Sequence, residues 1–197
     1  MPKATMIFVT GNKYKFKIAK QALEKISLKI EISQRKLDVP EIQSDSVEAV
    51  ANFSARWASG VLKKPTVVSD GGCYIEALGG FPGPFVKYIN KWLSAKDILR
   101  LMDGRKNRRV LWKDCLAYCI SGQQPISFVS HFEGALAGRI GKNKYRRKYG
   151  WIDTLFIPQG SAQPLSELTT KEYLKFWCNN RNYNSWQKLL EYLKTVG

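Results

Sequence analysis

Short β-branched runs alternate with segments of helical period along the chain, and this alternation restricts the fold more than any other feature of the sequence. The apolar run 5–10 stops at Gly11, and apolar residues then recur at three- and four-residue steps over 15–26. This pattern predicts a strand, a tight turn and a helix. The same alternation follows, with a strand predicted at 28–32 and a helix at 47–62.

The remaining segments continue the alternation toward the C-terminus. We predict strands at 66–70, 110–120, 126–136 and 153–158, with a hairpin joining 110–120 to 126–136. Segment 74–77 either continues the strand 66–70 or forms a new one. We predict helices at 85–92, at 94–102 behind an N-cap at Ser94, from Lys171 behind a cap at Ser166 or Thr169, and at 186–195 with Leu189, Leu190 and Leu193 inward. No repeat or linker interrupts the chain, so a single α/β domain over 1–197 is predicted, with a mixed sheet flanked by helices.

Composition excludes several classes of protein. The 197 residues are 44% hydrophobic and 12% aromatic, which is enough for a packed core and argues against disorder. No apolar run approaches the roughly 20 residues of a membrane helix, and the N-terminal segment is too short for a signal peptide, so we predict a cytoplasmic protein without membrane contact. Four cysteines without CxxC spacing and a single histidine, His131, predict reduced thiols and a structural histidine rather than a zinc site.

Basic residues outnumber acidic ones, and the formal net charge is +16. A field of this sign concentrates polyanions such as nucleotides and nucleic acids. Part of the excess lies in two clusters, 105–109 and 142–148. Each cluster is either a solvated loop or a contact for phosphate, and the spacing alone leaves both interpretations open.

A first candidate site lies where the first predicted strand gives way to the first helix. There the sequence reads Thr10-Gly11-Asn12, with Lys15 one turn into the helix. Free backbone N–H groups and the helix dipole make such a turn an anion site. Gly11 allows close backbone approach, Asn12 offers a donor and Lys15 a positive charge. The other interpretation is a strand-to-helix turn with a purely geometric role.

A second candidate is a pair of carboxylates far apart in sequence, Glu41 and Asp70. Asp70 ends a β-branched strand just before two glycines, which exposes it. Magnesium binds to a few carboxylates together with phosphate oxygens and water, and hydrolysis needs a base or a metal to activate water. The two acids are therefore either metal ligands or residues that form turns.

These residues belong to a longer series of motifs in a fixed order. The series consists of 10–15 (TGNxxK), 37–43 (LDVPEIQ), 52–56 (NFSAR), 69–72 (SDGG), 77–87 (ALGGFPGPFVK), 132–134 (FxG) and 156–158 (FIP). In this order the chain resembles the inosine triphosphate pyrophosphatases, which remove noncanonical purine triphosphates from the nucleotide pool. The resemblance covers nearly the whole chain.

The resemblance implies an elongated mixed sheet in two lobes with the nucleotide in a cleft between them, and a homodimer. It also implies magnesium-dependent attack of water on the α-phosphorus, with Mn²⁺ as a substitute metal, and release of pyrophosphate. Lys15 would hold phosphate, Glu41 and Asp70 would bind the metal, and Asp70 would also position or deprotonate the water. Lys87 would contact the triphosphate or sugar, and Arg56 stands where the family has a lysine. Lys15 and Asp70 are thus the predicted catalytic residues.

Several positions depart from the family pattern. Ser69 stands where the family has an acid, which predicts weaker metal binding. The segment that brackets the base in the family appears as 149–154, with one extra residue. Tyr149, Gly150, Trp151 and Asp153 are the predicted base-binding residues, and a purely hydrophobic role is the alternative for Trp151.

The family's base-reading Ser-His-Arg is absent, and its region reads FWCNNRNYNS over 176–185, with Arg181 as a donor. Loss of hydrogen-bonding groups should change base preference more than phosphate chemistry. The sequence therefore predicts a pyrophosphatase with altered or relaxed base selection. A nucleotide- or nucleic-acid-binding protein that has lost catalysis is the alternative, because basic clusters lie close to Trp112, Tyr145 and Trp151.

Overall fold

The computed structural model describes residues 4–24, 30–146, 150–179 and 185–196. Its strands are β1 Ala4–Val9, β2 Ile30–Arg35, β3 Thr66–Ile75, β4 Pro82–Gly83, β5 Arg109–Cys119, β6 Ile126–Leu136 and β7 Phe156–Pro158. Its helices are α1 Lys13–Glu24, α2 Val47–Leu62, α3 Val86–Trp92, α4 Ala95–Leu101, α5 Gly150–Leu155, α6 Thr170–Asn179 and α7 Ser185–Val196, with short 3₁₀ turns at Glu76–Leu78 and Leu165–Glu167.

The strands form a seven-stranded sheet in the order β2-β1-β3-β5-β6-β7, with β4 paired to β3. Strand β1 runs parallel to both β2 and β3, whereas β3 with β4 and β6 with β7 are antiparallel. Parallel pairs need crossover connections, and here helices α1 and α2 supply them. The predicted α/β fold with a mixed sheet flanked by helices is confirmed.

The chain divides into two compact units. The first unit comprises Met1–Asp70, Asp114–Ser130 and Cys178–Gly197, and the second comprises Gly71–Lys113 and His131–Trp177. Each unit has its own hydrophobic core.

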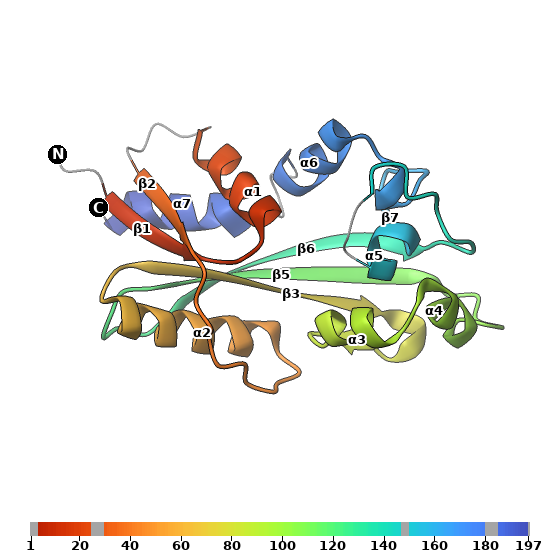
Figure 1. Ribbon diagram of the computed structural model, residues 1–197, viewed down its shortest axis with the longest axis horizontal. Coiled ribbons are helices and arrows are strands. Elements are labelled where there is room, and N and C mark those ends of the chain that lie inside the picture. The colour runs from red at the N-terminus through yellow and green to blue at the C-terminus, as the bar shows by residue number, and fades with distance from the viewer. Residues whose placement is uncertain (1–3, 25–29, 147–149, 180–184, 197) are drawn as a thin grey trace. The chain divides into compact units, whose positions relative to one another are not determined.

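In the first unit, helices α1 and α7 lie on one side of the strands and α2 lies on the other (Figure 1). The core beneath α1 and α7 includes Phe8, whose ring meets that of Trp186 edge-on at 5.1 Å between centroids. Leu116 and Leu189 are fully buried in the same core. The apolar spacing of the two terminal segments thus predicts both helices correctly, and Leu189 and Leu190 point inward as expected.

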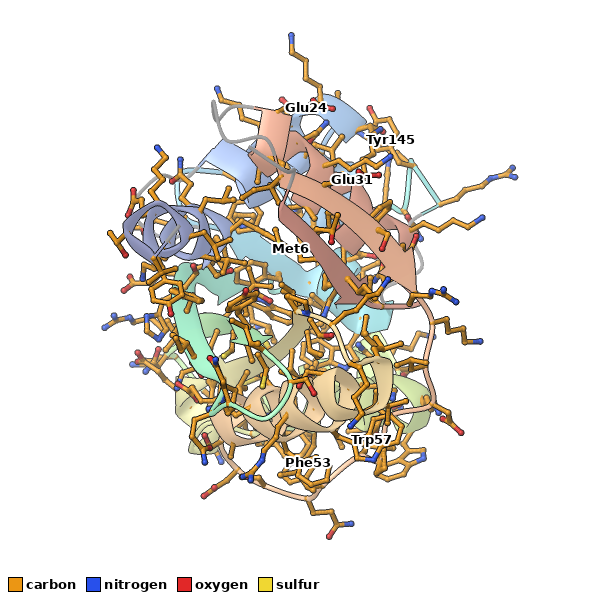
Figure 2. The ribbon with its side chains drawn as sticks, turned by 90° about the vertical axis from the view of Figure 1, so that its left-hand side faces the viewer. Met6, Glu24, Glu31, Phe53, Trp57 and Tyr145 are labelled. Carbon is orange, nitrogen blue, oxygen red and sulfur yellow. The ribbon has the colours of Figure 1, made fainter. Side chains whose placement is uncertain are left out.

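Helix α2 has the predicted bounds, but the side that packs on the strands is not its bulky apolar stripe. Its buried residues are mostly small: Val47, Ala51, Ser54, Ala55, Ala58 and Ser59. Phe53 is 37% exposed, and Figure 2 shows Phe53 and Trp57 on the side of the helix away from the strands, whereas Met6 points into the interior. Small residues allow the helix backbone to approach the sheet closely.

The second unit packs α3, α4 and α5 around a separate core that contains Trp112, Phe132, Trp151 and Phe156. Ser94 caps α4 as predicted, in a capping box with Asp97. Thr169 caps α6 through reciprocal hydrogen bonds with Glu172, so the cap expected at Ser166 or Thr169 lies at Thr169.

One sequence-based assignment requires correction. The strand expected at 153–158 begins only at Phe156, because 150–155 forms α5 and brings Trp151, Ile152 and Leu155 onto one buried face at helical spacing. Of the two alternatives for 74–77, the structure has the continuation, since β3 runs unbroken to Ile75. His131 is exposed on β6.

The cysteines that the structure describes are as expected. Cys73, Cys115 and Cys119 are free and buried, while the side chain of Cys178 lies outside the described residues. Within the described part of the chain, no helix is long and apolar enough to cross a membrane.

Candidate active site

The turn after β1 is held by short-range hydrogen bonds. The Asn12 backbone N–H donates to the Thr10 hydroxyl oxygen at 3.1 Å, and the Asn12 side-chain oxygen accepts from the Lys15 N–H at 3.2 Å. Asn12 is therefore the N-cap of α1. The Gln34 side chain donates to the Thr10 carbonyl at 2.9 Å, which ties the turn to β2.

Gly11 is exposed at this turn, and a Cβ there would meet only the Lys36 side chain, at 3.8 Å. The glycine is therefore not needed to avoid a clash within the chain. It keeps the backbone at the helix N-terminus open to a ligand, which agrees with the predicted phosphate site.

Lys15 extends from the first turn of α1 to the middle of β3. Its ammonium donates to the Ser69 carbonyl at 3.0 Å. Asp70 is the next residue along β3 and is half-buried. The Lys15 ammonium, 55 positions away in sequence from the other residue predicted to be catalytic, thus lies beside the backbone that carries Asp70.

The structure adds a carboxylate that the sequence analysis missed. Asp114 on β5 accepts a hydrogen bond from the Ser185 hydroxyl at 3.1 Å, and the Ser69 hydroxyl also bonds to it. Burial raises the pKa of Asp114, and the nearby Asp70 carboxylate raises it further, whereas the Lys15 ammonium and the two hydroxyls oppose the shift. A polar pair, Lys113-Asp114, inside an otherwise apolar strand is the signal that could have indicated it.

Cys115 is the next residue, and its side chain lies on the opposite side of β5 from Asp114. Burial raises the pKa of its thiol to about 12, and the carboxylates of Asp114, Glu48 and Asp70 raise it too. The thiol is therefore protonated near neutral pH and unsuited to act as a nucleophile. The same interactions place Glu48, from the first turn of α2, within electrostatic range of this region.

The donor set in the first unit fits magnesium in chemistry. Carboxylate oxygens are available from Asp70, and Glu41 is exposed in the loop between β2 and α2. Among the described residues no three His, Cys, Asp or Glu side chains are already gathered around one point. That arrangement suits a cation held by one or two carboxylates and by substrate phosphates, which is how Mg²⁺ commonly binds, rather than one held in a protein cage.

The sequence model of the Ham1 family matches residues 6–189. A dITP/XTP pyrophosphatase of Methanopyrus kandleri is 36% identical over 170 residues, which are 86% of this chain and 87% of that protein. The chain belongs to the Ham1 family.

Other relatives agree with this assignment. A dITP/XTP pyrophosphatase of Hyperthermus butylicus is 34% identical over 178 residues, covering 89% of both chains. The Ham1 protein of Coxiella burnetii superposes with a TM-score of 0.77 at 18% identity, covering 98% of this chain and 99% of that one. The Ham1 protein of Staphylococcus aureus gives 0.76 at 19%, covering 98% and 100%. These structures establish the Ham1 fold.

Of the remaining residues predicted for the site of this Ham1 chain, some are exposed and others lie outside the described residues. Arg56 is exposed on α2 in the first unit, and Lys87 is exposed on the first turn of α3 in the second, with its ammonium 5.7 Å from the Tyr88 ring centroid. Both charges are thus accessible to solvent. Tyr149 and Arg181 lie outside the described residues.

The segment predicted to bracket the base is mostly interior in this Ham1 protein. Trp151 is 2% exposed and Asp153 is 1% exposed. Trp151 belongs to the core of the second unit, so its hydrophobic alternative is the one that the structure supports. Gly150 has φ +62, and a Cβ there would lie 2.5 Å from Asn90 Oδ1, so packing alone requires glycine.

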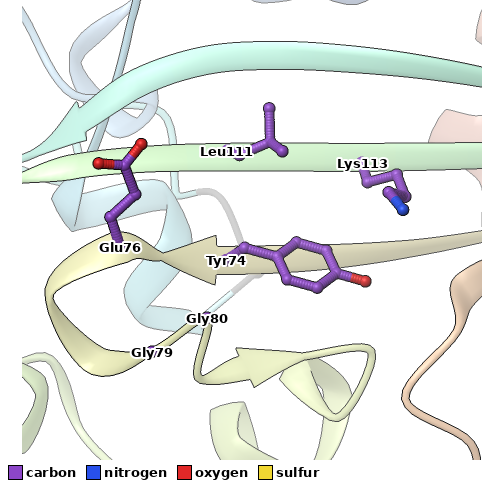
Figure 3. Close-up of a pocket in the computed structure, with 6 residues that line it drawn as sticks. All are labelled: Tyr74, Glu76, Gly79, Gly80, Leu111 and Lys113. Carbon is purple, nitrogen blue, oxygen red and sulfur yellow. The ribbon is translucent and has the colours of Figure 1, made fainter.

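The second unit also contains a depression of about 360 Å³ lined by Tyr74, Glu76, Gly79, Gly80, Leu111 and Lys113. Figure 3 shows the Tyr74 ring lying along β3 and Lys113 on the neighbouring β5. The Lys113 ammonium is 5.7 Å from the Tyr74 ring centroid. None of the predicted site residues lines this depression.

Proposed function

We propose that this chain hydrolyses noncanonical purine nucleoside triphosphates, in ribo or deoxy form, to the monophosphate and pyrophosphate. Membership of the Ham1 family supports the proposal, as do curated relatives that are named dITP/XTP pyrophosphatases. The structural observation that carries it is the 3.0 Å bond from the Lys15 ammonium to the Ser69 carbonyl, which places a cation next to Asp70.

The roles of the residues follow from their chemistry. The phosphates bind at the turn of Thr10, Gly11 and Asn12, through the Gly11 backbone N–H, the dipole of α1 and the Lys15 ammonium. Mg²⁺, or Mn²⁺ in its place, would be held by Glu41 and Asp70 and would neutralise charge on the phosphates. Asp70 orients the attacking water and accepts its proton. Arg56 and Lys87 supply further positive charge to the triphosphate.

Base selection is the altered part of this proposal. The sequence lacks the family's Ser-His-Arg, and Trp151 and Asp153 are buried in the core of the second unit. A polar site rejects a wrong base because that base leaves some of the site's polar groups unpaired. Fewer such groups are exposed in this chain. We propose relaxed selection among purine triphosphates.

The nucleic-acid-binding alternative has less support. Stacking on single-stranded nucleic acid needs exposed aromatic rings. Trp112 is 5% exposed and Trp151 2%, and Tyr145, at 44%, is the exposed member of the three aromatics named in that hypothesis.

We also propose the homodimer expected from the family resemblance, which light scattering during size exclusion would test.

Pyrophosphate release tests the function directly. The purified protein is given Mg²⁺ and the triphosphates of inosine, xanthosine, guanosine, adenosine and pyrimidines in ribo and deoxy forms. We expect turnover of inosine and xanthosine substrates, with at most a modest preference over guanosine. Absence of turnover with every substrate would reject the proposal.

The mechanism is tested with Asp70→Asn, which preserves shape and removes the base. We expect kcat to fall by roughly 10²- to 10⁴-fold, the usual contribution of a general base. Asp45→Asn, a change of the same charge at an exposed loop position, is the matched control and should retain activity. Full activity in Asp70→Asn would refute the assignment of the base.

A further inference from the structure

Three residues from three other elements converge on one carboxylate of the first unit. Asp114 on β5 is bonded by Ser185 at the start of α7 and by Ser69 on β3, and it interacts electrostatically with Lys15 on α1. Lys15 in turn donates to the carbonyl of the same Ser69. Asp114 and Lys15 thus form a charge pair through Ser69 as their common neighbour.

Strand periodicity places these groups on one side of the sheet. Val67 on β3 and Leu116 on β5 belong to the core beneath α1 and α7. Side chains two positions apart in a strand share a face, so Ser69 and Asp114 lie on that same face, where α1 and α7 bring Lys15 and Ser185. Asp70, one position on, belongs to the other face.

We propose that Asp114 is a positioning residue for the reaction: its carboxylate orients the Lys15 ammonium and supplies the negative charge that position 69 lacks in this chain. The inference rests on the proposed function, because it assigns Lys15 to phosphate. A serine at 69 with an aspartate beside it on β5 keeps the local charge while moving it one strand across the sheet.

Asp114 is held by contacts from three side chains. The Ser185 hydroxyl donates to its carboxylate at 3.1 Å, and the Ser69 hydroxyl and the Lys15 ammonium also interact with it. Burying a carboxylate is costly unless charges or hydrogen bonds compensate for lost water. These contacts compensate for that cost and fix the carboxylate close to Lys15.

The competing explanation is structural: Asp114 could serve only to anchor the start of α7 through Ser185. Asp114→Asn keeps the shape and can still accept from Ser185, so it separates the two roles. The matched control is Glu31→Gln, an equal change of charge on the exposed side of β2. The double variant Ser69→Asp/Asp114→Ser returns the carboxylate to β3 and tests whether charge at this place is what matters.

Steady-state kinetics with the best substrate of the wild-type protein, and calorimetric binding of inorganic pyrophosphate, are the measurements. For Asp114→Asn we expect kcat to fall about tenfold or more, because a misplaced catalytic group loses rate steeply with distance. Pyrophosphate affinity should stay equal or increase, because a negative charge beside an anion site has been removed. The double variant should recover most of kcat, and Glu31→Gln should match the wild type.

Two outcomes would overturn the inference. One is a kcat of Asp114→Asn within twofold of the wild type. The other is a fall in kcat that accompanies a lower melting temperature and is not recovered in the double variant, which would indicate the structural role. If the wild-type protein hydrolyses no triphosphate, the proposed function fails first, and the kinetic comparison is not reached; the two failures are thus distinguishable.

Discussion

The two units of this protein use polar residues differently. In the first unit the residues predicted to bind phosphate and metal reach the surface, with Gly11 and Glu41 exposed and Lys15 and Asp70 half-buried. In the second unit the predicted base-binding residues Trp151 and Asp153 are buried. The residues predicted to bind phosphate are therefore accessible, whereas Trp151 and Asp153 of the predicted base-binding segment belong to the interior.

The difference follows from what each segment must bury. The turn after β1 satisfies its own backbone groups through Thr10, Asn12 and Gln34, so it needs no apolar cover. Segment 150–155 instead packs Trp151, Ile152 and Leu155 against the second core. A motif position in a self-satisfied turn can be used for a ligand, whereas a motif position on a core helix is restricted by packing.

The largest expected change in stability comes from replacing Trp151, and it tests whether this residue belongs to the core of the second unit. Trp151→Ala should lower the free energy of unfolding by about 3–5 kcal/mol, because it empties a buried site in the second core. Trp92→Ala is the matched control in the same unit, since Trp92 is 71% exposed. Chemical unfolding measures both variants. Equal stability of the two would mean that Trp151 is accessible and free to stack on a base.

A smaller change in stability is expected at Asp114 in the first unit. Replacing this residue should raise stability with increasing pH, whereas replacing Trp151 lowers it. The folded-state pKa of Asp114 is raised by burial, so the wild type loses stability as pH rises from the unfolded-state pKa through the folded-state value. Asp114→Asn lacks this loss. Its stability relative to the wild type should therefore increase over that pH range and level off above it, as measured by melting temperatures from acid to neutral pH. A difference in melting temperature that stays constant or decreases over this pH range would contradict this expectation.

The smallest effect concerns the α4 cap of the second unit. Ser94→Ala should cost about 1 kcal/mol, the usual value for loss of an N-cap side chain. The Ser94 hydroxyl and backbone N–H lower the pKa of Asp97. This stabilisation is present above the unfolded-state pKa of Asp97 and is lost as pH falls through the lower folded-state value.

The difference in unfolding free energy between wild type and Ser94→Ala should therefore narrow in acid, and urea titrations at neutral and acidic pH would measure it. The exposed Ser33, on β2, gives a control for a Ser→Ala change away from a helix cap. If the difference in unfolding free energy stays constant with pH, the Asp97 carboxylate does not contribute to the cap.

Local sequence determined much of this protein. Periodicity predicted the bounds of α2 and the positions of β5 and β6, because apolar residues recur with the period of the helix or strand that carries them. The order of motifs predicted the family, and the turn at 10–15 was identified as a helix N-terminus. Each of these depends on residues close together in the chain.

Only the tertiary structure decided the rest. It put the apolar stripe of α2 outward, because the alanines opposite that stripe allow closer contact with the sheet. It turned 150–155 into a buried helix, since Trp151, Ile152 and Leu155 share a face only at helical spacing. It also brought Asp114 to Lys15, Ser69 and Ser185 across four elements. The polar pair Lys113-Asp114 marks this position in the sequence. It does not show which neighbour the carboxylate meets, because strand pairing, and not spacing along the chain, makes positions on two strands adjacent.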